Sequence, residues 1–288
     1  MAVLSETTKI PLELLDHRHQ KISQQTKNDI LKAKFSQVLI ADGLEYGFFK
    51  INRFGEIDNV CTNQPLASIK GFIFEVATVR YINDNITTIG KRLFDWATNK
   101  LRSSTDEYIQ QYKAIGTGFT STQNQYPSLY EPHSNADIRF IRVCQTLENG
   151  WEFALINDHN IPASIQIKAI TSNELNQIIR PLLSGKYTHV LTFLYGNNGR
   201  HTYINCMNEI RKMSLKGEIT SEEKDFLEAR ICSPEHFGIR QYEIDDYSEY
   251  IDYWYRGRAR MESNNLIKAV SFEIAGYKYN EGGILIPD

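Results

Sequence analysis

The chain has few cysteines, and their arrangement does not favour a covalent or metal cross-link. The four cysteines are far apart and none belongs to a CxxC pair, so a zinc site built on paired cysteines is not expected. The N-terminus lacks the basic region and apolar run of a secretory signal, from which we expect a cytoplasmic location and reduced thiols. The four residues are Cys61, Cys144, Cys206 and Cys232.

Long apolar runs and an excess of basic charge are also missing. No stretch reaches membrane-spanning length, so we expect no membrane association. The 32 basic and 35 acidic residues give a net charge of −3, which means that any basic surface must be concentrated in one place. Hydrophobic residues make up 41% of the 288 residues, enough for one sizeable core or a core with a smaller subdomain.

Two catalytic signatures are absent from the chain. It contains neither a GxxxxGK[ST] phosphate loop nor a Gly-x-Ser-x-Gly nucleophile elbow, which disfavours P-loop chemistry and acyl transfer. The histidines His133, His159, His189 and His201 do not show metal-ligand spacing. We expect His189 to begin a buried strand at Val190–Tyr195 rather than to act as a base.

A strand over residues 163–170 carries the most informative residues. Polar and apolar residues alternate there, which places Gln166 and Lys168 on one face of the strand. Asp137 stands at the start of another predicted strand, Ile138–Cys144. A carboxylate, an amide oxygen and a lysine on neighbouring strands can support metal-assisted hydrolysis of a phosphodiester, because the oxygens hold the cation and the lysine offsets developing charge.

The pattern of the whole chain predicts an α/β or α+β protein in three regions. Residues 1–65 are predicted to form an N-terminal helix and a β-hairpin, with strands at Val38–Ile40 and Gly47–Ile51. Residues 66–200 form the core, in which helices over 69–83 and 87–101 precede a long loop at 116–135. Strands at Ile138–Cys144, Trp151–Ile156 and 163–170 follow, then a helix near Leu175–Leu182 and the strand Val190–Tyr195. Residues 201–288 are helical and aromatic, with a capping box at Thr220.

Asp137, Gln166-Ile167-Lys168 and the helix and apolar strand that follow resemble the PD-(D/E)xK nuclease core in its QxK variant. The resemblance covers roughly residues 66–200. It implies a restriction-endonuclease-like core, with a mixed four- to five-stranded sheet flanked by helices, and it implies phosphodiester cleavage, expected on double-stranded DNA, in restriction or phage defence. The gap between Asp137 and Gln166 is longer than the family usually shows, and the extra strand at Trp151–Ile156 would absorb it.

The resemblance also implies roles for individual residues. Asp137 would bind Mg²⁺ (or Mn²⁺) directly, and Gln166 would be a second ligand or would position the attacking water. Lys168 would activate that water or stabilise the transition state. Glu75, in Phe74-Glu75-Val76, is similar to the glutamate that often completes the metal shell from a preceding helix. Cleavage of both strands of a duplex would favour a homodimer.

Each of these residues also has a structural reading. Lys168 can be a solvated lysine on an edge strand, Asp137 a strand-start residue with local backbone hydrogen bonds, and Glu75 an exposed helix charge. The alternative function is a non-catalytic nucleic-acid-binding or assembly subunit that uses its aromatic C-terminal region as an interface.

Three arginines after an aromatic run, Arg256, Arg258 and Arg260, are candidates for contacts with nucleic-acid phosphates. The neighbouring aromatics could stack on bases. The alternatives are an aromatic packing cluster beside solvated arginines, or a subunit contact.

Overall fold

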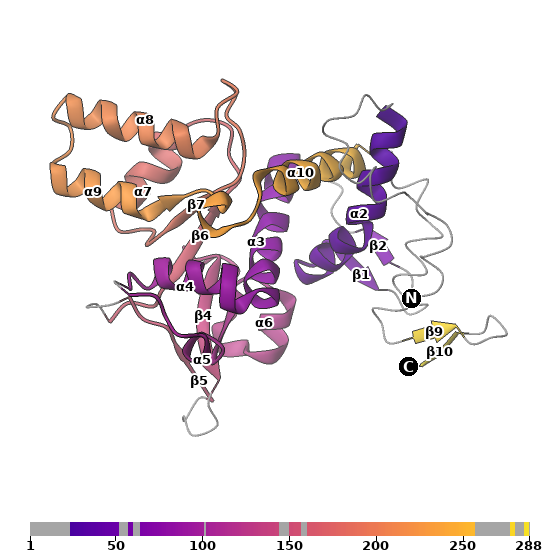
Figure 1. Cartoon of the computed structure of the whole chain (residues 1–288). Helices are drawn as coiled ribbons and strands as arrows, with labels where there is room; N and C mark the ends of the chain where they lie inside the picture. Colours follow the sequence, from indigo (N-terminus) through magenta and orange to yellow (C-terminus); the bar gives the residue numbers. More distant parts are fainter. Residues whose placement is uncertain are drawn as a thin grey trace. The chain divides into compact units, whose positions relative to one another are not determined.

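The computed structural model describes residues 24–51, 57–59, 64–100, 102–143, 150–156, 160–256, 277–279 and 285–287 (Figure 1). The chain divides into two compact units. The central unit is Ala67–Ile244, and the terminal unit combines the segments up to Leu66 and from Asp245. The central unit therefore extends past the expected boundary at residue 200, because helices beyond that point cover its sheet. Within the described part of the chain, no helix has the length and apolarity needed to cross a membrane.

The terminal unit contains helix α2 (Gln24–Glu45), the hairpin of β1 (Phe49–Ile51) and β2 (Ile57–Asn59), most of α10 (Gln241–Tyr255) and the pair β9 (Tyr277–Tyr279) and β10 (Leu285–Pro287). The predicted hairpin is present, but the strand predicted at Val38–Ile40 is wrong, since these residues lie within α2. The β-branched character of Val38 and Ile40 is overridden by burial of Leu31, Phe35 and Leu39 at helical spacing.

Aromatic residues of α10 pack inside the terminal unit. Tyr247 stacks on Phe35 at 5.0 Å between ring centroids and donates a hydrogen bond of 2.7 Å to Asp42 Oδ2. Trp254 meets Phe49 edge to face at 5.3 Å. The aromatic run of the C-terminal region thus contributes to a hydrophobic core, as the packing alternative predicts.

A mixed six-stranded sheet, among the described residues, forms the middle of the central unit, and the α/β class is confirmed. The strand order is β3-β4-β6-β7-β8, and β5 pairs with the second half of β4. Strands β3, β4, β5 and β6 pair in antiparallel fashion, whereas β6, β7 and β8 run parallel. Their bounds are β3 Tyr112–Gly116, β4 Ile138–Val143, β5 Trp151–Phe153, β6 Ser164–Lys168, β7 Val190–Thr192 and β8 Ile231–Cys232.

Helices cover both faces of this sheet. On one face, Phe74 of α3 stacks on Phe193 at 4.9 Å, and Phe94 of α4 meets Phe140 at 5.2 Å. On the other face, Val190 packs with buried residues of α7, α8 and α9. The helical segments are α3 Leu66–Asp84, η3 Ile86–Gly90, α4 Lys91–Ala97, α5 Asp106–Ile109, α6 Thr120–Gln125, η4 Pro127–Leu129, η5 Leu175–Ile179, α7 Arg180–Leu183, α8 Thr202–Leu215, α9 Ser221–Arg230 and η6 Pro234–Phe237.

Three features of the central unit differ from the sequence prediction. Residues 116–135 hold α6 and the short turn η4 rather than one long loop. Strands β3 and β8 were not predicted, and they raise the sheet from the expected four or five strands to six. β8 is two residues long, too short to show any periodicity.

Candidate functional site

Polar side chains form a strip across one face of the sheet, between two apolar clusters. Gln166 is the register partner of Val190, and Arg139 is the register partner of Ser164, so each pair lies on one face of the sheet. Residues two positions apart on one strand share a face, which places Lys168 with Gln166 and Asp137 with Arg139. At one end of the strip Val190 belongs to the α7–α8–α9 cluster, and at the other end Ile115, Leu129 and Ile141 form a second cluster. We call this set the polar strip: Asp137, Arg139, Ser164, Gln166 and Lys168.

Asp137 is fixed to the neighbouring strand by two hydrogen bonds. Its Oδ2 atom accepts one from Gln166 Nε2 at 2.5 Å and one from the backbone N–H of Ile167 at 2.6 Å. Both donors lie on β6, far away in sequence, so the local strand-start role for Asp137 does not describe its side chain. The predicted pairing of Asp137 with Gln166 is therefore a real contact in this fold.

The environment of Asp137 opposes its ionisation. Burial raises the pKa of this carboxyl to about 6, against the lowering effects of the Ile167 N–H, the Lys168 charge and the Gln166 amide. A carboxylate with this pKa is ionised at neutral pH but is held there at a free-energy cost. A cation bound beside it would relieve that cost.

Lys168 supplies a positive charge at the same edge of the strip. β6 lies between β4 and β7, so Lys168 stands on an interior strand and not on an edge strand. Its Nζ lies 4.9 Å from the centroid of the Tyr187 ring, and it forms no ion pair with a described carboxylate. Its charge nevertheless acts on Asp137, whose pKa it lowers.

The oxygen atoms of the strip fit a hard divalent cation such as Mg²⁺. Both described hydrogen bonds of the Asp137 carboxyl group end on Oδ2, which leaves Oδ1 available. Gln166 Oε1 is buried and accepts no hydrogen bond from a described residue. Mg²⁺ takes oxygen ligands and commonly keeps several waters beside one or two carboxylates. No group of three or more His, Cys, Asp or Glu that could hold a metal occurs among the described residues, so any site here would rely on Gln166 and on non-protein oxygens.

Glu75 is not brought to this group. Its neighbour Phe74 packs α3 against Phe193, and Phe193 faces away from Val190 by strand alternation. α3 therefore covers the face opposite to Gln166, and Glu75 is not among the groups that shift the pKa of Asp137. Glu75 is 7% exposed, which also rules out the exposed-charge reading. The structure does not support its predicted place in a metal shell.

The C-terminal arginines are described only in part. Arg256 is exposed just beyond α10 in the terminal unit, and its backbone N–H donates to the carbonyl of Asp252. Arg258 and Arg260 lie outside the described residues. A phosphate contact by these arginines stays a prediction.

Sequence reasoning missed Arg139. It stands two residues after Asp137 on β4, so the alternation that selected Gln166 and Lys168 would also have selected it. Its Nη2 donates to Glu131 Oε2 at 2.9 Å, while its Nε is buried without an acceptor among the described residues. The polar strip thus carries two cationic groups beside one carboxylate.

His189 has the structural role that was expected. It directly precedes β7 and is fully buried, with Nε2 3.1 Å from Asn99 Oδ1 and its ring against Trp96. Burial, followed by the charge of Arg230, holds the pKa of His189 well below its usual range. It faces the side of the sheet opposite to Gln166, so it does not contribute to the strip.

Comparisons of the chain with protein-family models, with curated proteins and with solved structures found no match.

Proposed function

We propose that this protein is a Mg²⁺- or Mn²⁺-dependent nuclease that hydrolyses phosphodiester bonds in nucleic acid, with DNA as the expected substrate. The observation that carries the proposal is the direct contact of Asp137 with Gln166, in a strip that also holds Lys168. The order of the elements supports it, because a helix and a parallel strand follow β6 as the resemblance to the PD-(D/E)xK core implies.

Each residue of the strip has a part in this proposal. When bound, the cation would polarise a phosphate oxygen and lower the pKa of a coordinated water. Asp137 would hold it through Oδ1, while Gln166 and the Ile167 N–H keep Oδ2 in place. Lys168 would stabilise charge that develops on the phosphate, since its ammonium is not engaged by a described carboxylate.

A matched pair of lysine variants tests the proposal. Lys168 and Lys186 both lie over the Tyr187 ring, at 4.9 and 5.4 Å from its centroid. Only Lys168 belongs to the polar strip. With plasmid, linear duplex, single-stranded DNA and RNA in Mg²⁺ or Mn²⁺, we expect Lys168→Ala to lower the cleavage rate by about 10²- to 10³-fold, as loss of a transition-state charge contact does. Lys186→Ala should cleave like the wild type.

Two results would overturn the proposal. One is cleavage by Lys168→Ala at the wild-type rate, and the other is the absence of cleavage of every substrate by the wild type. The second result, combined with retained nucleic-acid binding, would identify the alternative, a protein that binds without cutting. The presence of a single carboxylate in the strip is the observation that favours this alternative.

A further inference from the structure

A pocket of the central unit lies just beyond the polar strip. Its volume is about 600 Å³, and three segments line it: the loop that leads from β6 into η5, the loop after β7, and one side of α8. The first lining residue of the loop from β6 into η5 is Thr171, three residues after Lys168, where β6 ends. Three residues of chain span at most about 11 Å, so the pocket lies close to the candidate reacting centre.

The pocket and the strip lie on the same face of the sheet. α8 buries Cys206, Ile210 and Met213 in the cluster that contains Val190, and Val190 shares its face with Gln166. The walls of the pocket also stand at the carboxyl ends of the parallel strands β6 and β7. Ligands of open α/β sheets bind preferentially at such ends.

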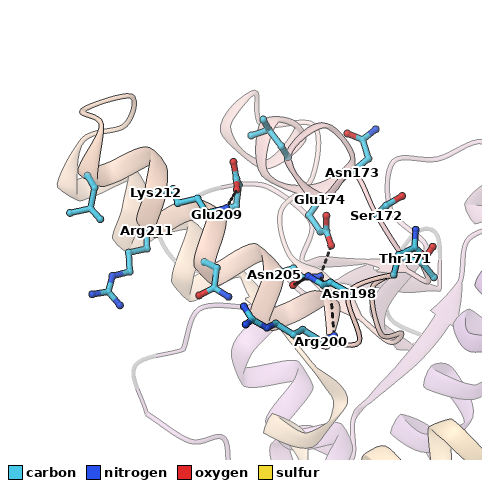
Figure 2. Close-up of a pocket in the computed structure, with 14 residues that line it drawn as sticks. Thr171, Ser172, Asn173, Glu174, Asn198, Arg200, Asn205, Glu209, Arg211 and Lys212 are labelled. Atoms are coloured by element: carbon cyan, nitrogen blue, oxygen red, sulfur yellow. Dashed lines mark hydrogen bonds and ion pairs between the residues drawn. The ribbon is translucent and has the colours of Figure 1, made fainter.

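Hydrogen bonds among two asparagines and a glutamate hold the pocket in a defined shape. Asn205 Nδ2 donates to Glu174 Oε1 at 2.9 Å, and Asn198 Nδ2 donates to Asn205 Oδ1 at 2.9 Å (Figure 2). The loop after β7 packs so closely that a Cβ atom on Gly196 would lie 2.5 Å from Asn205 Nδ2. These contacts join both loops to α8, so the site is preorganised.

The charge of the lining favours an anion. Three cationic side chains stand against two carboxylates, and Lys212 is paired with Glu209 at 3.1 Å. Arg200 and Arg211 are exposed and form no ion pair among the described residues, and in Figure 2 they lie on the side of α8 away from that pair. Two guanidinium groups are therefore available to a ligand.

The chemistry of the lining favours a sugar-phosphate backbone over a base. None of the lining residues is aromatic, so the pocket has no platform on which a base could stack. Arginine, asparagine, serine and threonine are the side chains that contact phosphates and sugars in nucleic-acid complexes. The lining residues are Thr171, Ser172, Asn173, Glu174, Leu175, Asn197, Asn198, Arg200, Asn205, Asn208, Glu209, Arg211, Lys212 and Leu215.

We infer that this pocket binds the phosphodiester backbone of the substrate strand a few nucleotides away from the bond to be cut, with Arg200 and Arg211 on its phosphates. This inference rests on the proposed nuclease function and extends it with a second contact region. One strand of B-DNA carries a phosphate about every 3.4 Å along the helix axis, so a reach of about 11 Å corresponds to about three nucleotides.

The test compares the Arg200→Gln/Arg211→Gln variant with a control that loses the same charge elsewhere. Arg102 is exposed outside the pocket, and Lys224 is partly exposed on α9, so Arg102→Gln/Lys224→Gln is the matched control. Binding of fluorescein-labelled 24-nucleotide DNA and RNA, as single strands and as duplexes, is measured by anisotropy between 50 and 200 mM KCl. EDTA is present, so that no metal-dependent cleavage occurs.

Loss of two phosphate contacts should weaken binding about tenfold or more at 100 mM salt and reduce the slope of log K against log salt by about 2. The control variant should keep more than half of the wild-type slope of log K against log salt. A second pocket variant, Asn208→Asp, adds a negative charge at the lining and should weaken binding in the same direction. The strand type with the largest loss identifies the backbone that the pocket accepts.

Equal affinity and slope for the double arginine variant and its control would overturn the inference, as would a wild type that binds none of the four probes. Cleavage by the wild type and Lys168→Ala is assayed separately in Mg²⁺. If nothing is cut but the arginine variant still loses binding, the proposed function fails and the pocket stands. If cutting depends on Lys168 while binding ignores the arginines, the pocket fails and the function stands.

Discussion

Replacing Asp137 by asparagine should make the protein more stable at alkaline pH. Burial raises the pKa of the carboxyl from 3.8 to about 6, so the folded state resists an ionisation that the unfolded state accepts. Each pKa unit corresponds to 1.36 kcal/mol, which gives a destabilisation of about 3 kcal/mol above pH 7. An asparagine Oδ1 in the position of Oδ2 can accept both hydrogen bonds that Gln166 and Ile167 donate. Asp137→Asn therefore removes the charge and keeps the contacts.

The direction of the pH dependence follows from the raised pKa. Well below pH 3.8 the carboxyl is protonated in both states, and the substitution changes little. As pH rises from 3.8 towards 6 the unfolded state ionises first, and the wild type loses stability relative to the variant. The gain from Asp137→Asn should be about 0.5 kcal/mol at pH 4 and about 3 kcal/mol at pH 8.

Amide hydrogen exchange of peptides that cover β4 and β6 measures this gain, because it reports opening of the central unit by itself. Asp225→Asn is the control, since Asp225 is exposed on α9 and its substitution should leave the exchange unchanged at both pH values. Magnesium at 100 times its dissociation constant should add about 2.7 kcal/mol to the wild type and much less to Asp137→Asn. A variant that is equal to or less stable than the wild type at pH 8 would refute the claim that Asp137 is held ionised at a cost.

Two further predictions concern the reaction and the fold. Cleavage at limiting Mg²⁺ should fall about tenfold from pH 7 to pH 5, because Asp137 loses its charge as pH falls through about 6. Excess Mg²⁺ should move the midpoint of this fall to lower pH. A cleavage rate that stays flat to pH 5 would contradict this prediction. Thr220→Ala should destabilise α9 by about 1 kcal/mol, because the hydrogen bond that Thr220 Oγ1 accepts from the Glu223 N–H is lost. Hydrogen exchange of α9 measures this destabilisation, with Ser221→Ala as the control. Cleavage should be unchanged.

The sequence predicts the arrangement of the polar strip best where this arrangement depends on strand alternation. A period of two placed Gln166 and Lys168 on one face, and Asp137 at the start of a neighbouring strand joins them because β4 and β6 pair. The capping box at Thr220 is also confirmed, since both of its reciprocal hydrogen bonds are formed. These signals are local, so they can be read from a short stretch of chain.

The features that sequence reasoning missed depend on tertiary packing. Glu75 lies on a predicted helix that is present, but the face of the sheet that α3 covers is set by Phe74 meeting Phe193, which no local pattern encodes. The segment Val38–Ile40 has strand propensity and becomes helical, because α2 buries its apolar residues in the terminal unit. The pocket beside α8 is assembled from two loops and one side of a helix between Thr171 and Leu215, so no single motif could indicate it.

A glutamine at position 166 has a consequence that a carboxylate there would not have. Its Nε2 donates to Asp137 at every pH, whereas a glutamate would have to be protonated to do so. Two carboxylates at this distance would also raise each other's pKa, and the burial of Asp137 already raises it to about 6. With Gln166 the strip holds one negative charge beside the cationic Lys168 and Arg139, so its protein ligands alone attract a divalent cation weakly. Under the proposed function, the phosphate of a bound nucleic acid would supply the missing negative charge, and we therefore expect metal and nucleic acid to bind with positive coupling.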